Sequence, residues 1–125
     1  MTARVQNNGL ARITSLLIAA SWYFGWGTGS GAAASANTTT TTSTTEARTL
    51  ATAAQGTTTV TNDNMTLTGT ITAAGTRAIT EVGAFDAAGS GSPPTGGNMD
   101  VYGDFTVINL ASGDSIAFTV KVTFS

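Results

Sequence analysis

The sequence predicts an all-β fold, a single β-sandwich of jelly-roll or Ig-like type with a short N-terminal helix and an extended Thr-rich loop. Apolar and polar residues alternate in several segments, most regularly over residues 116–124, as in strands with one buried face. Turn residues separate these segments into roughly six or seven strands. Because 125 residues suit one domain, we expect an arm and helix at 1–20 and the sandwich, with a flexible loop at 30–45, at 21–125.

The composition argues against several classes of function. Charged residues make up 10% of the chain, against roughly 25% in an average soluble protein, and a surface of Thr and Ser hydroxyls suits a protein that packs against neighbours. The net charge is −2 and the five basic residues are scattered, so we expect no nucleic-acid binding. The chain has no Cys and no His, which removes thiolate nucleophiles and the commonest general base and metal ligand. We therefore expect no enzyme, no catalytic residue, no cofactor and no metal site.

The N-terminal segment predicts a short helix from Gly9 to about Ala20. Apolar residues recur there at three- and four-residue steps between Leu10 and Leu17, and Asn7 or Asn8 could cap the helix. The apolar run at 13–26 is interrupted by polar residues and is shorter than the roughly 20 residues that a bilayer requires. We therefore expect no membrane span.

Residues 21–26 hold four of the nine aromatic residues of the chain and predict a strand. Such a cluster has two interpretations, a core strand or a platform on which sugars or bases stack, since aromatic residues are enriched in both settings. The core interpretation is favoured. The aromatic residues nevertheless remain candidates for partner binding.

Residues 30–45 are almost entirely Gly, Ala, Ser and Thr, with five consecutive threonines. A segment without large apolar residues cannot offset its ordering entropy by burial, which predicts an extended loop that orders only against a neighbour. A mucin-like stalk is the alternative, and the absence of Pro from the tract weakens it. The candidate partner-binding residues of the chain are Trp22, Tyr23, Phe24, Trp26, Thr38, Thr39, Thr40, Thr41 and Thr42.

The centre of the chain predicts two strands, at 65–73 and 77–85, joined by three residues that include Gly75. Such a short connection predicts an antiparallel hairpin. A weaker strand is expected at 46–54, and a short one at 57–61 after a turn at Gln55 and Gly56.

The C-terminal part of the chain predicts two more strands. A flexible loop with two prolines at 87–97 precedes the first, at 99–107. A connection at 109–114 then leads to the second, at 116–124, which has the clearest alternation in the sequence.

The acidic residues can be interpreted as structural or as functional. Glu81 is expected on the core side unless a bulge at Gly83 turns it outward, and we expect it to pair with Arg48 or Arg77 rather than act as a general acid, because no second carboxylate lies near it in sequence. Five aspartates could in principle bind Ca²⁺, but they form no D-x-D-x-D-G run, and turn capping is the favoured interpretation. These are Asp63, Asp86, Asp100, Asp104 and Asp114.

Three stretches together resemble a family of small structural proteins of tailed bacteriophages. They are Gly-Trp-Gly-Thr-Gly at 25–29, Ile-Thr-Glu-Val-Gly-Ala-Phe-Asp-Ala-Ala-Gly at 79–89, and Ile-Asn-Leu-Ala-Ser-Gly-Asp-Ser-Ile at 108–116. Asn-Gly-Leu at 8–10 before a helix adds to the resemblance, which covers most of the chain in the right order. The Thr tract and the Gly-Ser-Pro-Pro segment near 89–97 are longer and simpler than the family pattern.

The resemblance implies a β-rich virion component without an active site. The function that we expect from it is a capsid cement, or decoration, protein that bridges capsomers on the outer capsid surface after synthesis in the host cytoplasm. The implied partners are the major capsid protein and other copies of the chain, for example in a trimer. A tail, baseplate or fibre component is the alternative within the virion, and a carbohydrate-binding adhesive module is an alternative of another class.

Overall fold

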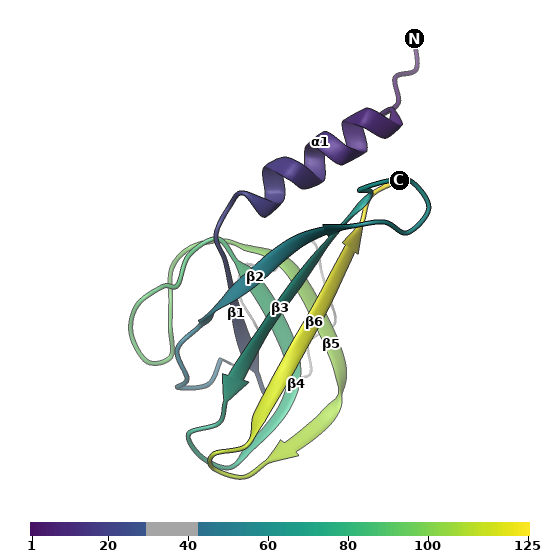
Figure 1. The fold of residues 1–125 in the computed structure, drawn as a ribbon. Helices are drawn as coiled ribbons and strands as arrows, with labels where there is room; N and C mark the ends of the chain where they lie inside the picture. The colour runs from purple at the N-terminus through teal and green to yellow at the C-terminus, as the bar shows by residue number, and fades with distance from the viewer. Residues whose placement is uncertain (30–42) are drawn as a thin grey trace.

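A computed structural model describes residues 1–29 and 43–125 (Figure 1). The elements in these residues are one helix and six strands, which confirms the all-β prediction with a short N-terminal helix. They are α1 (Asn7–Ile18), β1 (Trp22–Gly27), β2 (Thr49–Gly56), β3 (Asn64–Thr72), β4 (Arg77–Phe85), β5 (Met99–Leu110) and β6 (Ser115–Thr123). Most of the predicted Thr-rich loop, Thr38 to Thr42 included, lies outside the described residues.

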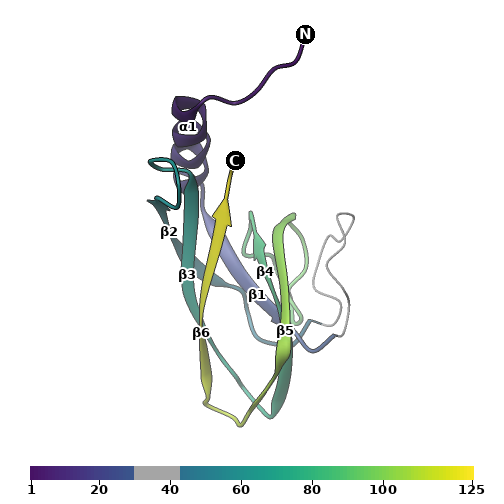
Figure 2. The ribbon, with the colours of Figure 1, turned by 90° about the vertical axis from the view of Figure 1, so that its right-hand side faces the viewer.

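The six strands form one continuous antiparallel sheet in the order β5-β4-β1-β2-β3-β6. The sheet curls until its two end strands, β5 and β6, face each other across the core, so that the fold is a nearly closed barrel (Figure 2). The rings of Phe105 on β5 and Phe118 on β6 are 6.0 Å apart between centroids. The finer expectation of a sandwich of jelly-roll or Ig-like type is not confirmed, because β2 pairs with both β1 and β3 and thereby joins the two layers into one sheet.

The predicted central hairpin is wrong, although both of its strands are present. β3 pairs with β2 and β6, whereas β4 pairs with β1 and β5. The connection between them is a corner whose backbone groups bond elsewhere: the Ala73 amide donates to the Asp114 carbonyl at 2.8 Å, and the Gly113 amide donates to the Ala73 carbonyl at 2.8 Å. The two strands therefore cover the core from opposite layers, with Ile71 and Ile79 both buried.

Helix α1 lies at one end of the barrel and extends away from it (Figure 1). It begins at Asn7, and its N-cap is Gln6 without a side-chain capping bond. The expected cap at Asn7 or Asn8 is therefore wrong; both residues lie in the first turn of the helix. The helix is attached through buried Thr14, whose hydroxyl donates to the Asn62 carbonyl at 2.7 Å and accepts from Gln55 Nε2 at 2.8 Å. Within the described residues, no helix has the length and apolar character needed to cross a bilayer.

Two further boundaries differ from the prediction. Residues 57–61 form a turn rather than a strand, because the Asp63 carboxylate accepts hydrogen bonds from the amides of Thr58, Thr59 and Val60 at 2.7 to 2.9 Å. The expected turn at Gln55 and Gly56 is instead the end of β2. A bound carboxylate of this kind satisfies the amides that a strand would have placed in a ladder.

Candidate functional site

The aromatic strand β1 belongs to the core. Trp22, Phe24 and Trp26 are 6%, 0% and 2% exposed, and β1 lies between β4 and β2 in the sheet. The indole N–H of Trp22 donates to the Leu17 carbonyl at 2.8 Å, and that of Trp26 donates to Thr44 Oγ1 at 2.7 Å. The core interpretation is confirmed, and these three rings leave no face on which a ligand could stack.

The structure does not decide the role of the remaining predicted partner-binding residues. Tyr23 is half-buried on the outer face of the sheet, opposite Leu50 and Phe85 in register. Thr38, Thr39, Thr40, Thr41 and Thr42 lie outside the described residues. Partner binding by these six residues stays a prediction.

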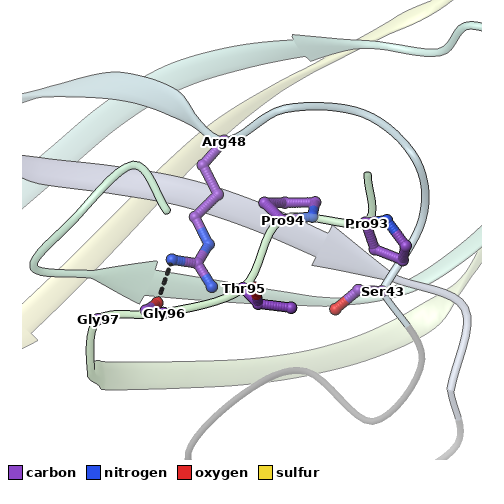
Figure 3. Close-up of a pocket in the computed structure, with 7 residues that line it drawn as sticks. All are labelled: Ser43, Arg48, Pro93, Pro94, Thr95, Gly96 and Gly97. Carbon is purple, nitrogen blue, oxygen red and sulfur yellow. Dashed lines mark hydrogen bonds between the residues drawn. The ribbon is translucent and has the colours of Figure 1, made fainter. Parts of the chain in front are cut away.

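A shallow pocket of about 320 Å³ lies where the loop after β4 folds back onto the start of β2 (Figure 3). The two prolines and Arg48 form its walls, and Arg48 points toward the backbone of the loop. Its lining residues are Ser43, Arg48, Pro93, Pro94, Thr95, Gly96 and Gly97. Sequence reasoning did not predict this pocket, because its residues come from segments more than 40 positions apart in the chain.

Arg48 holds this loop through its guanidinium group. Nη1 donates to the carbonyls of Ala87 at 3.0 Å and Gly96 at 2.7 Å, and Cζ lies 3.6 Å from the centroid of the Phe85 ring. Burial lowers the pKa of Arg48, and the carboxylate of Asp86 partly offsets this, but an arginine remains charged at any physiological pH. The cation thus fastens the predicted flexible loop to the sheet.

Small residues make room for the Phe85 ring on the outer face of the sheet. Gly25 and Gly83 lie opposite each other in the β1–β4 ladder, and a Cβ built on either would approach the ring to 3.1 and 2.9 Å. These distances are shorter than normal van der Waals contact. Both glycines are therefore needed where Arg48 presses the ring onto the sheet.

Glu81 is buried on the outer face of the sheet. A ladder irregularity between Ile79 and Glu81 turns the carboxylate away from the core, which confirms that a bulge decides its orientation but places that bulge before Gly83. Glu81 Oε2 accepts a hydrogen bond from Tyr102 Oη at 2.6 Å. Arg48 binds the loop carbonyls and Arg77 binds Glu46, so the expected pairing of Glu81 with either arginine stays a prediction.

Glu46 joins three parts of the fold. Its Oε1 accepts from Arg77 Nε at 2.9 Å and from the Ala74 amide at 2.9 Å, and its Oε2 lies 3.4 Å from Trp26 Nε1. Burial acts to raise the pKa of Glu46, but hydrogen bonds from Thr44 and the Ala74 amide outweigh it and lower the pKa from 4.5 to about 2. Glu46 therefore stabilises the corner between β3 and β4 in its ionised form.

Three of the five aspartates cap turns, as the favoured interpretation predicts. Asp63 binds three amides, Asp86 accepts from the Asn98 amide at 2.7 Å, and Asp114 accepts from the Ala111 amide at 2.8 Å. Asp100 and Asp104 are exposed on β5. No group of three or more His, Cys, Asp or Glu side chains within the described residues is placed to hold a metal ion.

Comparison with known proteins gives no relative: no protein family, curated protein or solved structure matches this chain. The assignment of a functional surface therefore depends on the geometry of the chain itself.

Partly buried apolar side chains are concentrated on the two end strands of the sheet. In the described part of the chain, β5 and β6 are not hydrogen-bonded neighbours, and five of the eight partly buried apolar residues that pack on the core belong to these strands. We call this region the β5–β6 seam; its residues are Val101, Gly103, Phe105, Ile116, Phe118, Val120 and Val122. The two strands meet at the turn 111–114 and separate toward the end that carries α1 (Figure 2).

An apolar cavity of about 40 Å³ borders the seam, between strands β1, β4 and β5 and the side chain of Val120 on β6. It is lined by Phe24, Val82, Gly83, Ala84, Val101, Tyr102, Gly103 and Val120. Unpaired strand edges beside half-buried apolar side chains are the usual template for adding a strand from another chain. The seam is therefore our candidate functional site, a surface for assembly.

The carboxylates of Glu46 and Asp63 predict a specific loss of stability in acid. Hydrogen bonds from the amides of Val60 and Thr59 lower the pKa of Asp63 from 3.8 to about 2 against the opposing effect of burial. Because both pKa values are lower in the folded protein, the unfolded chain binds more protons as the pH falls. Stability is thus expected to be constant above the unfolded-state pKa of 4.5 and to fall between that pH and about 2.

The melting temperature, followed by circular dichroism from pH 7 to pH 2, measures this loss. Glu46→Gln is expected to lower the melting temperature at pH 7 by about 5–10 °C, the scale of one or two lost hydrogen bonds to a charged group. The double variant Glu46→Gln/Asp63→Asn should also depend less on pH below 4.5. An acid transition as steep in the double variant as in the native chain would contradict this account.

Proposed function

We propose that this chain is a structural protein of a tailed-bacteriophage virion, most specifically a capsid cement protein that bridges capsomers on the outer surface of the head. The observation that supports the proposal is the β5–β6 seam, where, among residues 1–29 and 43–125, the edges of the two end strands have no hydrogen-bonded neighbour strand and an apolar cavity lies beside them. The resemblance of residues 25–29, 79–89 and 108–116 to phage structural proteins supplies the biological setting.

The composition supports the same proposal. Few charges and many hydroxyl groups give a surface on which each contact with a neighbour is weak and little affected by salt. On a symmetric shell such contacts repeat many times, and multivalency converts them into strong retention. The proposed partners are the major capsid protein and other copies of this chain, for example in a trimer.

A tail, baseplate or fibre component would use the same kind of surface, and it is the alternative within this proposal. The adhesive module has less support, since three of the four aromatic side chains on which it depends are buried. The finer sandwich description also remains a proposal, in which the layers β1-β4-β5 and β2-β3-β6 of the barrel correspond to its two sheets.

Particles produced without this protein test the proposed function. We expect normal tails but heads that release DNA at a lower temperature than complete particles, because the missing contacts across capsomer boundaries no longer resist internal pressure. Negative-stain imaging and a fluorescent dye that reports released DNA provide the measurements. Addition of the purified protein should restore the release temperature. Stable heads with defective tails would overturn the cement assignment and support the tail alternative.

A further inference from the structure

Residues 1–6 have the pattern of a strand without a sheet to join. Met1, Ala3 and Val5 are apolar, and the residues between them are polar, which is the two-residue period of a strand with one buried face. All six residues are exposed, with Val5 at 54%, and none of them belongs to a helix or strand. We call residues 1–6 the N-terminal arm.

The β5–β6 seam has the complementary properties. Its two walls are the outer edges of β5 and β6, which pair with no other strand in the described part of the chain. Because every neighbouring pair in the six-stranded sheet is antiparallel, these strands run in opposite directions. A strand between them would be antiparallel to one wall and parallel to the other, and both arrangements form regular ladders. The directions of the two walls therefore allow one further strand to pair with either of them.

The cavity in the seam can receive a side chain of that strand. Its volume of about 40 Å³ exceeds the 10–15 Å³ or so that one water needs, but an apolar cavity gives water too few hydrogen-bond partners. A Cβ built on Gly103 would lie 4.0 Å from the nearest atom, Val82 Cγ1. The space thus suits a small branched apolar group such as the side chain of Val5.

Charge complementarity also favours pairing of the N-terminal arm with the seam. The outer face of β5 carries exposed Asp100 and Asp104, and desolvation together with nearby Asp86 raises the pKa of Asp100, as expected for an acid near other negative charge. Arg4 would face outward in a strand whose odd residues point into the seam. The β6 wall carries one basic residue, Lys121. An incoming arginine would therefore lie near two carboxylates and one ammonium group.

The arm of one molecule is directed away from its own barrel. Helix α1 carries it outward from the end of the barrel (Figures 1 and 2), and the helix itself is held to the fold by Thr14. An arm directed in this way points toward neighbouring molecules rather than toward its own seam. We propose that the N-terminal arm of one copy inserts as an added strand into the β5–β6 seam of the next copy, with Val5 in the cavity and Arg4 beside Asp100 and Asp104.

Insertion of the arm specifies how copies would associate with one another. Its biological setting rests on the proposed function. The arm and the seam are different surfaces, so the contact is heterologous and closes into a ring or continues as a chain, according to the rotation between copies. Main-chain hydrogen bonds would supply affinity, and the cavity would set the register.

Disulfide capture tests the contact directly, because the chain contains no cysteine. Two single variants, Val5→Cys and Val120→Cys, one of them carrying a size tag, are mixed under mild oxidation. We expect a tagged–untagged heterodimer that forms at least about tenfold faster than with the control partner Leu50→Cys, because docking raises the local thiol concentration. Leu50 is a matched control, since it is 66% exposed on β2, away from the seam.

Three substitutions separate arm binding from folding. Val5→Asp should weaken self-association, measured by sedimentation velocity, by about tenfold or more, since it replaces one buried apolar contact by a charge. Thr2→Asp adds the same charge on the polar face of the arm and should weaken association less. Gly103→Val fills the cavity, so it should reduce association to a similar extent while the melting temperature stays equal to that of the native chain or rises.

Equal capture by Val120→Cys and Leu50→Cys would overturn the proposal, as would unchanged self-association in Gly103→Val. A disulfide that forms within one chain in the dilute double variant Val5→Cys/Val120→Cys would show instead that the arm fills its own seam. These measurements use the purified protein alone. If arm exchange fails, the head-stability experiment still tests the cement function. If exchange succeeds but the protein does not bind particles, the cement function is overturned and the exchange is not.

Discussion

Replacing Arg48 with alanine is expected to lower the free energy of unfolding by about 3 kcal/mol. The change leaves the carbonyls of Ala87 and Gly96 without their donor, and a lost hydrogen bond to a charged group costs roughly 1.5–3 kcal/mol. It also removes the cation 3.6 Å above the Phe85 ring, a contact that contributes about 0.5–2 kcal/mol. Urea unfolding followed by tryptophan fluorescence measures the total.

A conservative variant and a matched control show whether the geometry or the charge of Arg48 matters. Arg48→Lys keeps a positive charge but not the planar guanidinium that binds two carbonyls while stacking on a ring, so about half of the loss should remain. Arg12→Ala removes an exposed arginine on α1 and should change stability by no more than about 0.5 kcal/mol. If Arg48→Ala costs no more than Arg12→Ala, the loop is held by other contacts.

The strands could be predicted from the sequence because their signal is local. Two-residue alternation identified β3 and β6, and a β-rich run identified β4, all to within two residues at each end, since these signals come from residues that are near in sequence. The turn-capping role of Asp63 was predictable for the same reason, because its amide partners are only three to five residues away.

The pairing of the strands could not be predicted in the same way. The short connection between β3 and β4 is compatible with a hairpin, and only distant contacts decide against one. Ala73 is bound by residues of the 111–114 turn, and the Ala74 amide donates to Glu46, 28 positions earlier. Local turn chemistry determines where a chain reverses, whereas packing of the whole core determines which edges meet.

The candidate functional residues likewise divide into those with a local sequence signal and those decided by distant contacts. Aromatic residues at 22–26 predict both a core and a binding surface, and only the position of β1 between β4 and β2 decides for the core. The seam had a weak signal in the sequence, a glycine at 103 among alternating apolar residues of a strand. That glycine became informative only once the fold placed it on the wall of an apolar cavity that Val120 of β6 also lines.

Two inward-facing glycines, Gly69 on β3 and Gly103 on β5, are expected to respond to alanine with opposite signs. A Cβ at Gly69 would lie 2.8 Å from the Phe24 ring, which is fully buried and packs against Phe118 with centroids 5.9 Å apart. The fully buried ring has little space to move into beyond the apolar cavity of about 40 Å³ that it lines, so Gly69→Ala should destabilise the fold by about 1–3 kcal/mol, as overpacked cores do. At Gly103 the same Cβ has nothing closer than 4.0 Å.

Gly103→Ala should therefore be neutral or should stabilise the protein by up to about 1 kcal/mol, because alanine loses less backbone entropy on folding than glycine and its methyl group fills part of the cavity. Thermal and urea unfolding of the two variants beside the native chain measure both effects. Destabilisation of equal size at the two positions would mean that the cost comes from removing glycine from a strand rather than from the space around it. In that case the seam would be as tightly packed as the core around Phe24, and it could not admit a further strand.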